Sequence, residues 1–352
     1  MLNARDFGAL GDGQTDETTA LQRALDAAAK SGETVYLPAG VYPCSTLRLA
    51  PHVGLCGDPT WSFREFGGAV LRLNDRAACC LIDATDAFGA TLNGLCLDGA
   101  DNLGEGVHGV LTDPPAYPAQ ENVLRIERCK IAHFSGDGVF LNRIFCFTLR
   151  HSMFAHNGGH GAHIRGWDGF ILDNWFSGNR GAGWGAEEES ASITMTGNRI
   201  EWNKLGGVVL RGATHYNLTG NYIDRSRCAG ISIRPGRKGG IENGVFTITG
   251  NVIYRSGAPH GTPPEDLDSS QVRFEEVSGL VFTGNTLRAG QDDGGQGDFS
   301  PQHAIVLRAL KNSVIKDNVL DGAALQDLLV DLAGHGEGVI IQDNPGSLFV
   351  PN

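Results

Sequence analysis

One segment recurs with variation from about residue 90 to the C-terminus, and this repeat limits the possible folds more than any other feature of the chain. Its clearest copy is residues 193–210, ITMTGNRIEWNKLGGVVL. The copies share an asparagine that follows an alternating apolar stretch: Asn174, Asn198, Asn221, Asn251, Asn285, Asn318 and Asn344. These asparagines fall 24, 23, 30, 34, 33 and 26 residues apart, so a basic repeat of 22 to 24 residues carries insertions.

Each repeat places apolar residues at alternate positions in short pieces separated by Gly, Asn and Asp. This pattern is typical of short strands and predicts three of them per repeat. A repeat of this length cannot enclose a core alone, so consecutive repeats must stack and bury a continuous one. The sequence therefore predicts an all-β fold, a single-stranded right-handed parallel β-helix.

The recurring asparagine has an architectural explanation. A turn between strands needs a residue that tolerates left-handed backbone, and an Asn side chain can bond the backbone of neighbouring repeats. Stacked in register, the asparagines would form a ladder. Cys129 and Ser152 stand at the equivalent earlier positions, so we expect the ladder to weaken toward the N-terminus.

Composition excludes several classes of partner. The 352 residues include 50 glycines and carry a net charge of −12, which argues against nucleic acid. No run of 18 apolar residues predicts a membrane span. The eight cysteines show no metal-ligand spacing, and we expect most of them to be buried free thiols. We expect one domain over residues 1–352, with a capping module in residues 1–45 and coils from about residue 46.

The N-terminal stretch, residues 3–42, predicts a cap for the solenoid. A Gly/Asp-rich turn is followed by a helix for which Thr15 or Asp16 would be the N-cap and Gly32 the C-terminal stop. The apolar face of this helix comprises Ala20, Leu21, Ala24, Leu25 and Ala28. Such a helix would cover the open end of the core.

This stretch resembles the N-terminal module of the pectate-lyase-like superfamily, whose pattern runs DFGA-GDG-TDDT-A-Q-A and then PAG-Y. The matching residues are Asp6, Phe7, Gly8, Ala9, Gly11, Asp12, Gly13, Thr15, Asp16, Thr18, Ala20, Gln22, Ala24, Pro38, Ala39, Gly40 and Tyr42. Glu17 stands in place of the second Asp. The resemblance implies a right-handed parallel β-helix acting on polysaccharide; the module precedes hydrolases, lyases and phage tailspikes alike, so the reaction stays open.

The aligned repeats predict a substrate cleft. Residues 139–141 correspond to residues 162–164, 184–186, 208–210, 231–233, 272–274 and 305–307. Alternation turns the first and third residues of each triplet inward and the middle one outward. Long insertions on both sides of these strands would border a cleft on their outer face, which is the substrate groove in the pectate-lyase-like families.

Asp137 and His160 are the first candidates for catalysis. They precede equivalent strands one coil apart, where a carboxylate can orient an imidazole and raise its basicity for acid–base work. The GHG motif around His160, with Asp137 one coil earlier, is similar to the Asp and His signature of polygalacturonases. The alternative is a turn Asp and a turn His with no chemical role.

A charged column just after these strands supplies further candidates. Arg165 and Glu187 are candidates for catalysis, since an arginine in this column could neutralise a uronate carboxylate while the neighbouring carbon loses a proton, as lyase chemistry requires. We expect the substrate-binding residues to include His163, Trp167, Arg211, Arg234, Arg237 and Lys238. The alternative is an ion-pair ladder of alternating sign. Trp184 should point into the core.

Acidic loop residues leave the metal question open. Asp168, Glu188, Asp266, Asp268, Asp292, Asp293 and Asp298 could bind calcium, or could be solvated charges. No other cofactor is expected.

The sequence therefore predicts an enzyme that cleaves glycosidic bonds of an acidic polysaccharide, by hydrolysis or elimination. The alternative is a tailspike-like glycan-binding protein, for which a homotrimer would be expected. No signal peptide is visible, although a secreted or cell-surface location would suit such a substrate.

Overall fold

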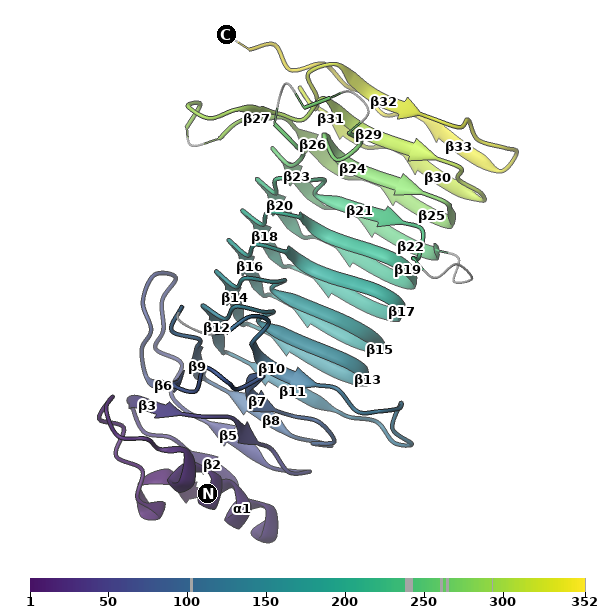
Figure 1. The fold of residues 1–352 in the computed structure, drawn as a ribbon. Coiled ribbons are helices and arrows are strands. Elements are labelled where there is room, and N and C mark those ends of the chain that lie inside the picture. The colour runs from purple at the N-terminus through teal and green to yellow at the C-terminus, as the bar shows by residue number, and fades with distance from the viewer. Residues whose placement is uncertain (102–103, 238–242, 260–261, 264–265, 293, 352) are drawn as a thin grey trace. The chain divides into compact units, whose positions relative to one another are not determined.

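The structure is a computed structural model that describes residues 1–101, 104–237, 243–259, 262–263, 266–292 and 294–351. It forms two compact units, Met1–Trp175 and Phe176–Asn352. Each unit consists of coils whose strands pair in parallel with those of the next coil (Figure 1). The prediction of a right-handed parallel β-helix is confirmed.

The first unit begins with a 3₁₀ turn, η1 (Ala4–Phe7), and the helix α1 (Thr18–Ser31). Its first sheet contains β1 (Leu2–Asn3), β2 (Thr34–Tyr36), β4 (Leu47–Arg48), β5 (Gly54–Cys56), β7 (Cys80–Asp83), β8 (Thr91–Asn93), β10 (His108–Thr112), β11 (Leu124–Glu127), β13 (Val139–Arg150) and β15 (Ala162–Leu172). Its second sheet contains β3 (Gly40–Cys44), β6 (Ala69–Leu73), β9 (Leu95–Asp98), β12 (Lys130–Ala132) and β14 (Met153–Ala155). The division between the units falls in β16 (Trp175–Ser177).

The second unit repeats this arrangement. Its first sheet contains β17 (Ala182–Thr196), β19 (Gly206–Thr219), β21 (Ile231–Arg234), β22 (Asn243–Thr249), β24 (Ser270–Glu275), β25 (Val277–Thr283), β29 (His303–Arg308), β30 (Ser313–Lys316), β32 (Asp327–Asp331) and β33 (Val339–Gln342). Its second sheet contains β18 (Arg199–Glu201), β20 (Tyr222–Asp224), β23 (Val252–Tyr254), β26 (Thr286–Arg288) and β31 (Val319–Leu320). A short antiparallel pair, β27 (Gly290–Gln291) and β28 (Phe299–Ser300), belongs to an insertion.

The predicted strand register is confirmed in both units. Val139 pairs with Ala162 in the first unit. In the second unit Trp184, Val208, Ile231, Val272 and Ile305 succeed one another across neighbouring strands. All seven residues are fully buried, including Trp184, so the inward direction assigned by alternation is correct.

The prediction of three separate strands per coil is wrong for the middle coils. There the cleft strand and the following strand merge into single strands of 11 to 15 residues. The register between β13 and β15 shifts at Arg143, which has φ 53°. One extra residue in left-handed conformation bends a strand without ending its pairing. The bulge therefore changes the chain direction at the place where a turn between two separate strands was expected.

The asparagine ladder is present. In the second unit, each backbone N–H from Asn198 to Asn318 donates to the side-chain oxygen of the next asparagine, at 2.9–3.1 Å. In the first unit, Cys129 N donates to Ser152 Oγ and Ser152 N donates to Asn174 Oδ1. Ser152 thus continues the ladder, while Cys129 contributes its backbone N–H and donates from its thiol to Glu127 O within its own coil.

The conformational reason given for the asparagines needs correction. The left-handed residue is the one before each asparagine, such as Asp173, Gly220 or Asp317. The asparagine itself is selected by hydrogen bonding, because its side chain both accepts from a backbone N–H and donates to a backbone carbonyl of the preceding coil.

Helix α1 buries the predicted apolar face and ends at Gly32, which has φ 70°. The predicted N-cap is wrong, because the cap residue is Glu17 and the Thr15 hydroxyl donates to Asp12. Glu17 is 1% exposed, and its Oε1 accepts from the backbone N–H groups of Leu10 and Gly11. It therefore fastens the Gly/Asp-rich turn to the start of the helix.

The cysteines are free thiols, but fewer are buried than expected. Four are buried, three are partly exposed and Cys79 is exposed. Within the described residues, no helix has the length and apolar character needed to cross a membrane.

The ladder can be tested with Asn285→Ala. This substitution removes the acceptor for Asn251 N–H and the donor to Ile248 O, and both of these hydrogen bonds are buried. We expect a loss of about 1 to 3 kcal/mol in the free energy of unfolding, measured by urea denaturation. Asn217→Ala, at an exposed position of β19, is the control and should be nearly neutral; equal losses in the two variants would contradict the ladder's role.

Candidate functional site

Asp137 is a buried carboxylate in the turn before β13. It is 6% exposed. Its Oδ1 accepts from the backbone N–H of His160 at 2.6 Å, and its Oδ2 lies 3.3 Å from His163 Nδ1. The two turns are joined by a bond from Gly138 N to His160 O, so the one-coil spacing inferred from the sequence holds.

The contact with Asp137 determines the proton position on His163. An ionised carboxylate can only accept hydrogen bonds, so His163 Nδ1 must carry the proton. Nε2 is then left with its lone pair and can act as a base or a ligand. His163 bonds the carboxylate through its ring, and His160 bonds it through its backbone N–H.

Asp137 stays ionised despite its burial. Burial by itself would raise the pKa of this carboxyl group, but the His163 hydrogen bond, the nearby imidazoles and the His160 N–H lower it more. The net result is a pKa below the usual value for Asp, so the carboxylate persists at neutral pH.

His108 and Phe140 complete the surroundings of this pair. His108 Nδ1 accepts from Asp137 N at 3.0 Å, which places its proton on Nε2. Burial lowers the pKa of His108, so this ring is neutral at pH 7. Phe140 stacks on His108 with centroids 4.9 Å apart and meets the His163 ring edge-on at 5.2 Å. Phe140 therefore holds His163 against Asp137.

Asp137, His160 and His163 could also hold a metal ion. One donor atom from each lies within 4.8 Å of the others, and this is the one such group of three found in the described part of the chain. Imidazole and carboxylate donors suit zinc and similar transition metals, whereas calcium prefers oxygen ligands. The donor set therefore does not fit calcium.

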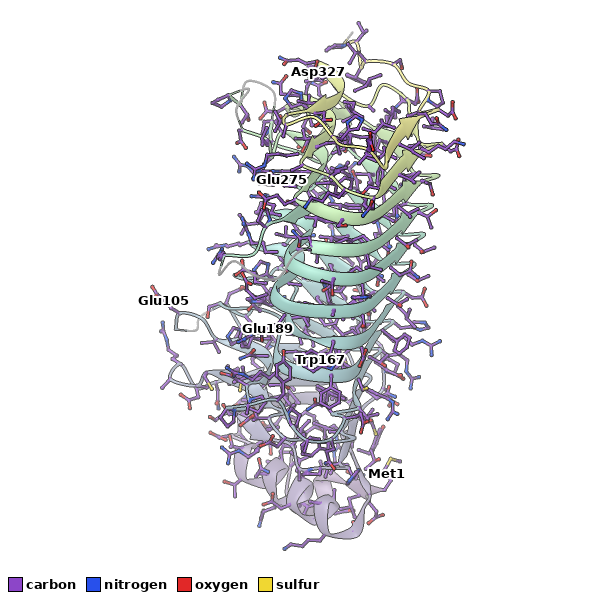
Figure 2. All side chains as sticks on the ribbon, turned by 90° about the vertical axis from the view of Figure 1, so that its right-hand side faces the viewer. Met1, Glu105, Trp167, Glu189, Glu275 and Asp327 are labelled. Atoms are coloured by element: carbon purple, nitrogen blue, oxygen red, sulfur yellow. The ribbon has the colours of Figure 1, made fainter. Side chains whose placement is uncertain are left out.

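Arg165 and Trp167 follow His163 on the outer face of β15, since the intervening residues Ile164 and Gly166 are buried. In the register of the two strands, Arg165 lies opposite Asn142 of β13. Trp167 lies on the outside of the coil (Figure 2), where it stacks on Tyr117 at 4.2 Å. Tyr117 covers one face of the indole, so at most the other face could contact a sugar ring.

The second unit carries the remaining predicted residues. Glu187, Arg211 and Arg234 occupy equivalent positions on β17, β19 and β21. Arg237 pairs with Glu187 at 3.0 Å, and its backbone N–H donates to Glu188. Lys238 and Asp293 lie outside the described residues.

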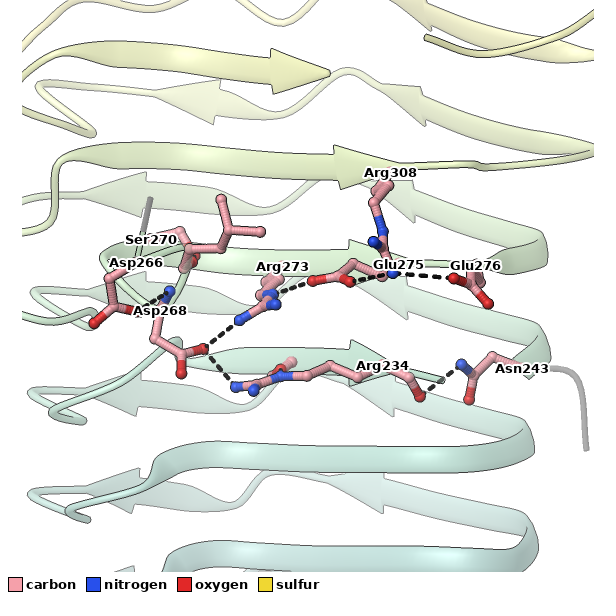
Figure 3. Close-up of polar contacts among 11 residues, drawn as sticks. Arg234, Asn243, Asp266, Asp268, Ser270, Arg273, Glu275, Glu276 and Arg308 are labelled. Carbon is pink, nitrogen blue, oxygen red and sulfur yellow. Dashed lines mark hydrogen bonds and ion pairs between the residues drawn. The ribbon is translucent and has the colours of Figure 1, made fainter. Parts of the chain in front are cut away.

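The Asp268 carboxylate forms ion pairs with two arginines. It bridges Arg234 and Arg273, and Arg273 in turn pairs with Glu275, which also holds Arg308 (Figure 3). These contacts occupy the carboxylate that was a candidate calcium ligand. Asp266 turns toward the backbone, accepting from Asp268 N.

Several residues around these sites were not among the predicted site residues: His108, Tyr117, Phe140, Arg273 and Glu275. Phe140 and Arg273 occupy the outward middle position of their triplets, which was a usable signal. Tyr117 comes from a loop, and no repeat alignment could have placed it beside Trp167.

Comparisons with known proteins agree with the architecture. The family model described as rhamnogalacturonase A/epimerase, pectate lyase-like, matches residues 1–72, and the right-handed β-helix region model matches residues 90–245 and 184–350. The A-module of mannuronan C-5 epimerase AlgE4 of Azotobacter vinelandii superposes with a TM-score of 0.73 and 21% identity, covering 99% of this chain and 100% of that one. DFA-IIIase from Arthrobacter chlorophenolicus A6, solved without its lid, superposes with a TM-score of 0.67 and 15% identity, covering 99% of each chain. These likenesses concern the fold.

Sequence relatives match about half of the chain. Mannuronan C5-epimerase AlgE1 of Azotobacter vinelandii is 34% identical over 187 residues, or 49% of this chain and 13% of that protein. Alginate lyase 7 of the same organism is 32% identical over 195 residues, or 49% of this chain and 20% of that protein.

Gly159→Ala tests the position of the Asp137 carboxylate. A Cβ on Gly159 would overlap Asp137 Oδ1 and crowd the backbone of Gly136, so the carboxylate must move. We expect His163 to change from a single Nδ1-protonated tautomer to a mixture, detected by ¹⁵N NMR of the imidazole. Gly336→Ala, where a Cβ would meet no atom within 4 Å, is the control. An unchanged tautomer in Gly159→Ala would show that Asp137 does not orient this ring.

Proposed function

Because this chain belongs to the right-handed β-helix family, we propose that it is an enzyme that modifies a uronate-containing polysaccharide by removing the proton next to the sugar carboxylate. The sequence relatives support this substrate class, since they are named as mannuronan C5-epimerases and an alginate lyase. Inversion at C5 and elimination across C4 and C5 share one step, the loss of the C5 proton. A base beside a carboxylate-binding group is therefore the expected machinery.

The observation that carries the proposal is the contact between Asp137 and His163. The carboxylate holds Nδ1–H, leaves Nε2 unprotonated and stabilises the imidazolium that forms when Nε2 takes a proton. A glycosidase would instead need two carboxyl groups about 5 to 9.5 Å apart, one of them free to act on the sugar. Asp137 is bonded to His163 and to the His160 backbone, which suits an orienting residue.

Arg165 is the proposed partner for the sugar carboxylate. Alternate residues on one strand face lie about 7 Å apart, so the Arg165 guanidinium and His163 can address one sugar unit. When C5 loses its proton, the electron pair spreads into the carboxylate, and a guanidinium stabilises that charge.

His160 is proposed to take part in the second half of the reaction. Its ring centroid lies 4.8 Å from that of His163. In elimination, the C4–O bond breaks as the C4–C5 double bond forms, and the leaving oxygen requires a proton. In epimerisation, a proton returns to C5 from the opposite face. Because His160 lies beside His163, it can supply the proton to the leaving oxygen in elimination.

His163→Ala should lower turnover severely and leave the fold intact. General-base catalysis contributes about 100- to 10,000-fold, and we expect kcat to fall within that range. Turnover would be followed on polymannuronate, polygalacturonate and neutral polysaccharides, by absorbance of the C4–C5 double bond and by NMR of the C5 configuration. His215→Ala, on an exposed position of β19, is the matched control; equal activity of the two variants would remove His163 from the mechanism.

Arg165→Gln should lower kcat for uronate substrates by about 100-fold or more, because the developing charge loses its counter-ion. Arg165→Lys should recover part of this loss, since it keeps the charge without the bidentate geometry. Binding of the parent chain to polyuronates without either product signal would instead favour a glycan-binding protein.

A further inference from the structure

Arg211 differs from the charged residues around it because every neighbour has a counter-ion. Arg237 pairs with Glu187, and Arg234 pairs with Asp268 and donates from Nε to Ser232 Oγ at 2.7 Å. Within the described ranges, Arg211 forms no hydrogen bond and no ion pair. Arg211 is nevertheless partly buried.

Arg211 lies in register between Glu187 on one side and Arg234 on the other, and the charged groups around it carry more positive than negative charge. Burial lowers the pKa of Arg211 most, and Arg234, Arg237 and Arg273 lower it further, whereas Glu187 raises it. Residues that pair in register on neighbouring strands lie about 4.8 Å apart, so Arg211 is next to Arg234 along the sheet. Like charges in such positions destabilise a sheet unless an anion lies between them.

The neighbouring side chains are fixed in place. Asp268 and Ser232 hold Arg234 toward β24, and Arg273 is held by Asp268 and Glu275 (Figure 3). Arg237 is held through both its side chain and its backbone, because Glu187 and Glu188 accept from it. The existing carboxylates are thus committed to the outer arginines, and Arg211 is the group left to meet a ligand.

We propose that Arg211 is the receptor for a sugar carboxylate in a binding subsite of the Phe176–Asn352 unit, with Arg234 and Arg237 as its flanking cations. A planar guanidinium bonds a carboxylate through two parallel N–H groups, which favours a uronate over a neutral sugar. The substrate class rests on the proposed function, but the subsite itself rests on the charge arrangement of this unit alone.

The test measures binding in a chain with severely lowered turnover. Titration calorimetry of His163→Ala with short oligomannuronates and oligogalacturonates would be repeated in the double variant that adds Arg211→Gln. We expect affinity to fall about 10- to 100-fold, the loss typical of a charge-assisted pair. Adding Arg211→Lys should give an intermediate loss, and the same oligosaccharides with carboxyl groups reduced to alcohols should show no dependence on residue 211.

Arg199→Gln is the matched control. Arg199 lies on β18 of the other sheet and pairs with Glu201, so the variant removes the same charge elsewhere. Thermal unfolding of each variant checks that the fold is retained. Equal uronate affinity with and without Arg211 would overturn the subsite, as would an absence of any uronate binding. Equal Arg211 dependence for sulfated oligosaccharides would overturn the assignment to a carboxylate.

The two proposals fail separately. Turnover of polyuronates by the parent chain together with binding that ignores Arg211 would overturn only the subsite. Arg211-dependent binding without turnover by the parent chain would overturn only the enzymatic proposal.

Discussion

Parallel pairing between successive coils is the constraint on which the rest of the structure depends. A coil of this length has too little apolar surface to form a core, so each strand is stable only when its neighbours saturate its backbone groups. The register of this pairing then determines which side chains are buried and which face solvent, because a shift of one residue would exchange the two faces. The inward positions at Val139, Ala162 and Trp184 are fully buried for this reason.

The asparagine ladder maintains that register at the turns. Each side chain joins the backbone of two coils, and the left-handed residue before it turns the chain without a side-chain penalty when it is glycine. Since the turns are fixed, the strand ends that follow them are fixed too. Asp137 and His160 occupy the next turn of their coils, before β13 and β15, where a backbone N–H of one coil binds a carboxylate of another.

The candidate sites of the two units use charge differently. In the first unit, one buried carboxylate serves a group of imidazoles and orients His163 through a single hydrogen bond. In the second unit, arginines and carboxylates form a connected series of ion pairs along neighbouring strands. A base needs an exact proton position, whereas the binding of a polyanion needs an excess of fixed cations, so the two arrangements suit different tasks.

The sequence by itself determined the fold class, the register and the faces of the strands. Period-two alternation and the recurring asparagine depend only on local chemistry and on the stacking rule, so residues as far apart as Trp184 and Ile305 could be assigned to one buried row. The fusion of strands at Arg143 was not visible, because a bulge has no strong residue preference. Only the tertiary structure decided that the His163 imidazole bonds Asp137 and that Arg211 has no ion-pair partner among the described residues. Those outcomes depend on side-chain directions and on loop contacts such as Tyr117 on Trp167, which no repeat pattern encodes.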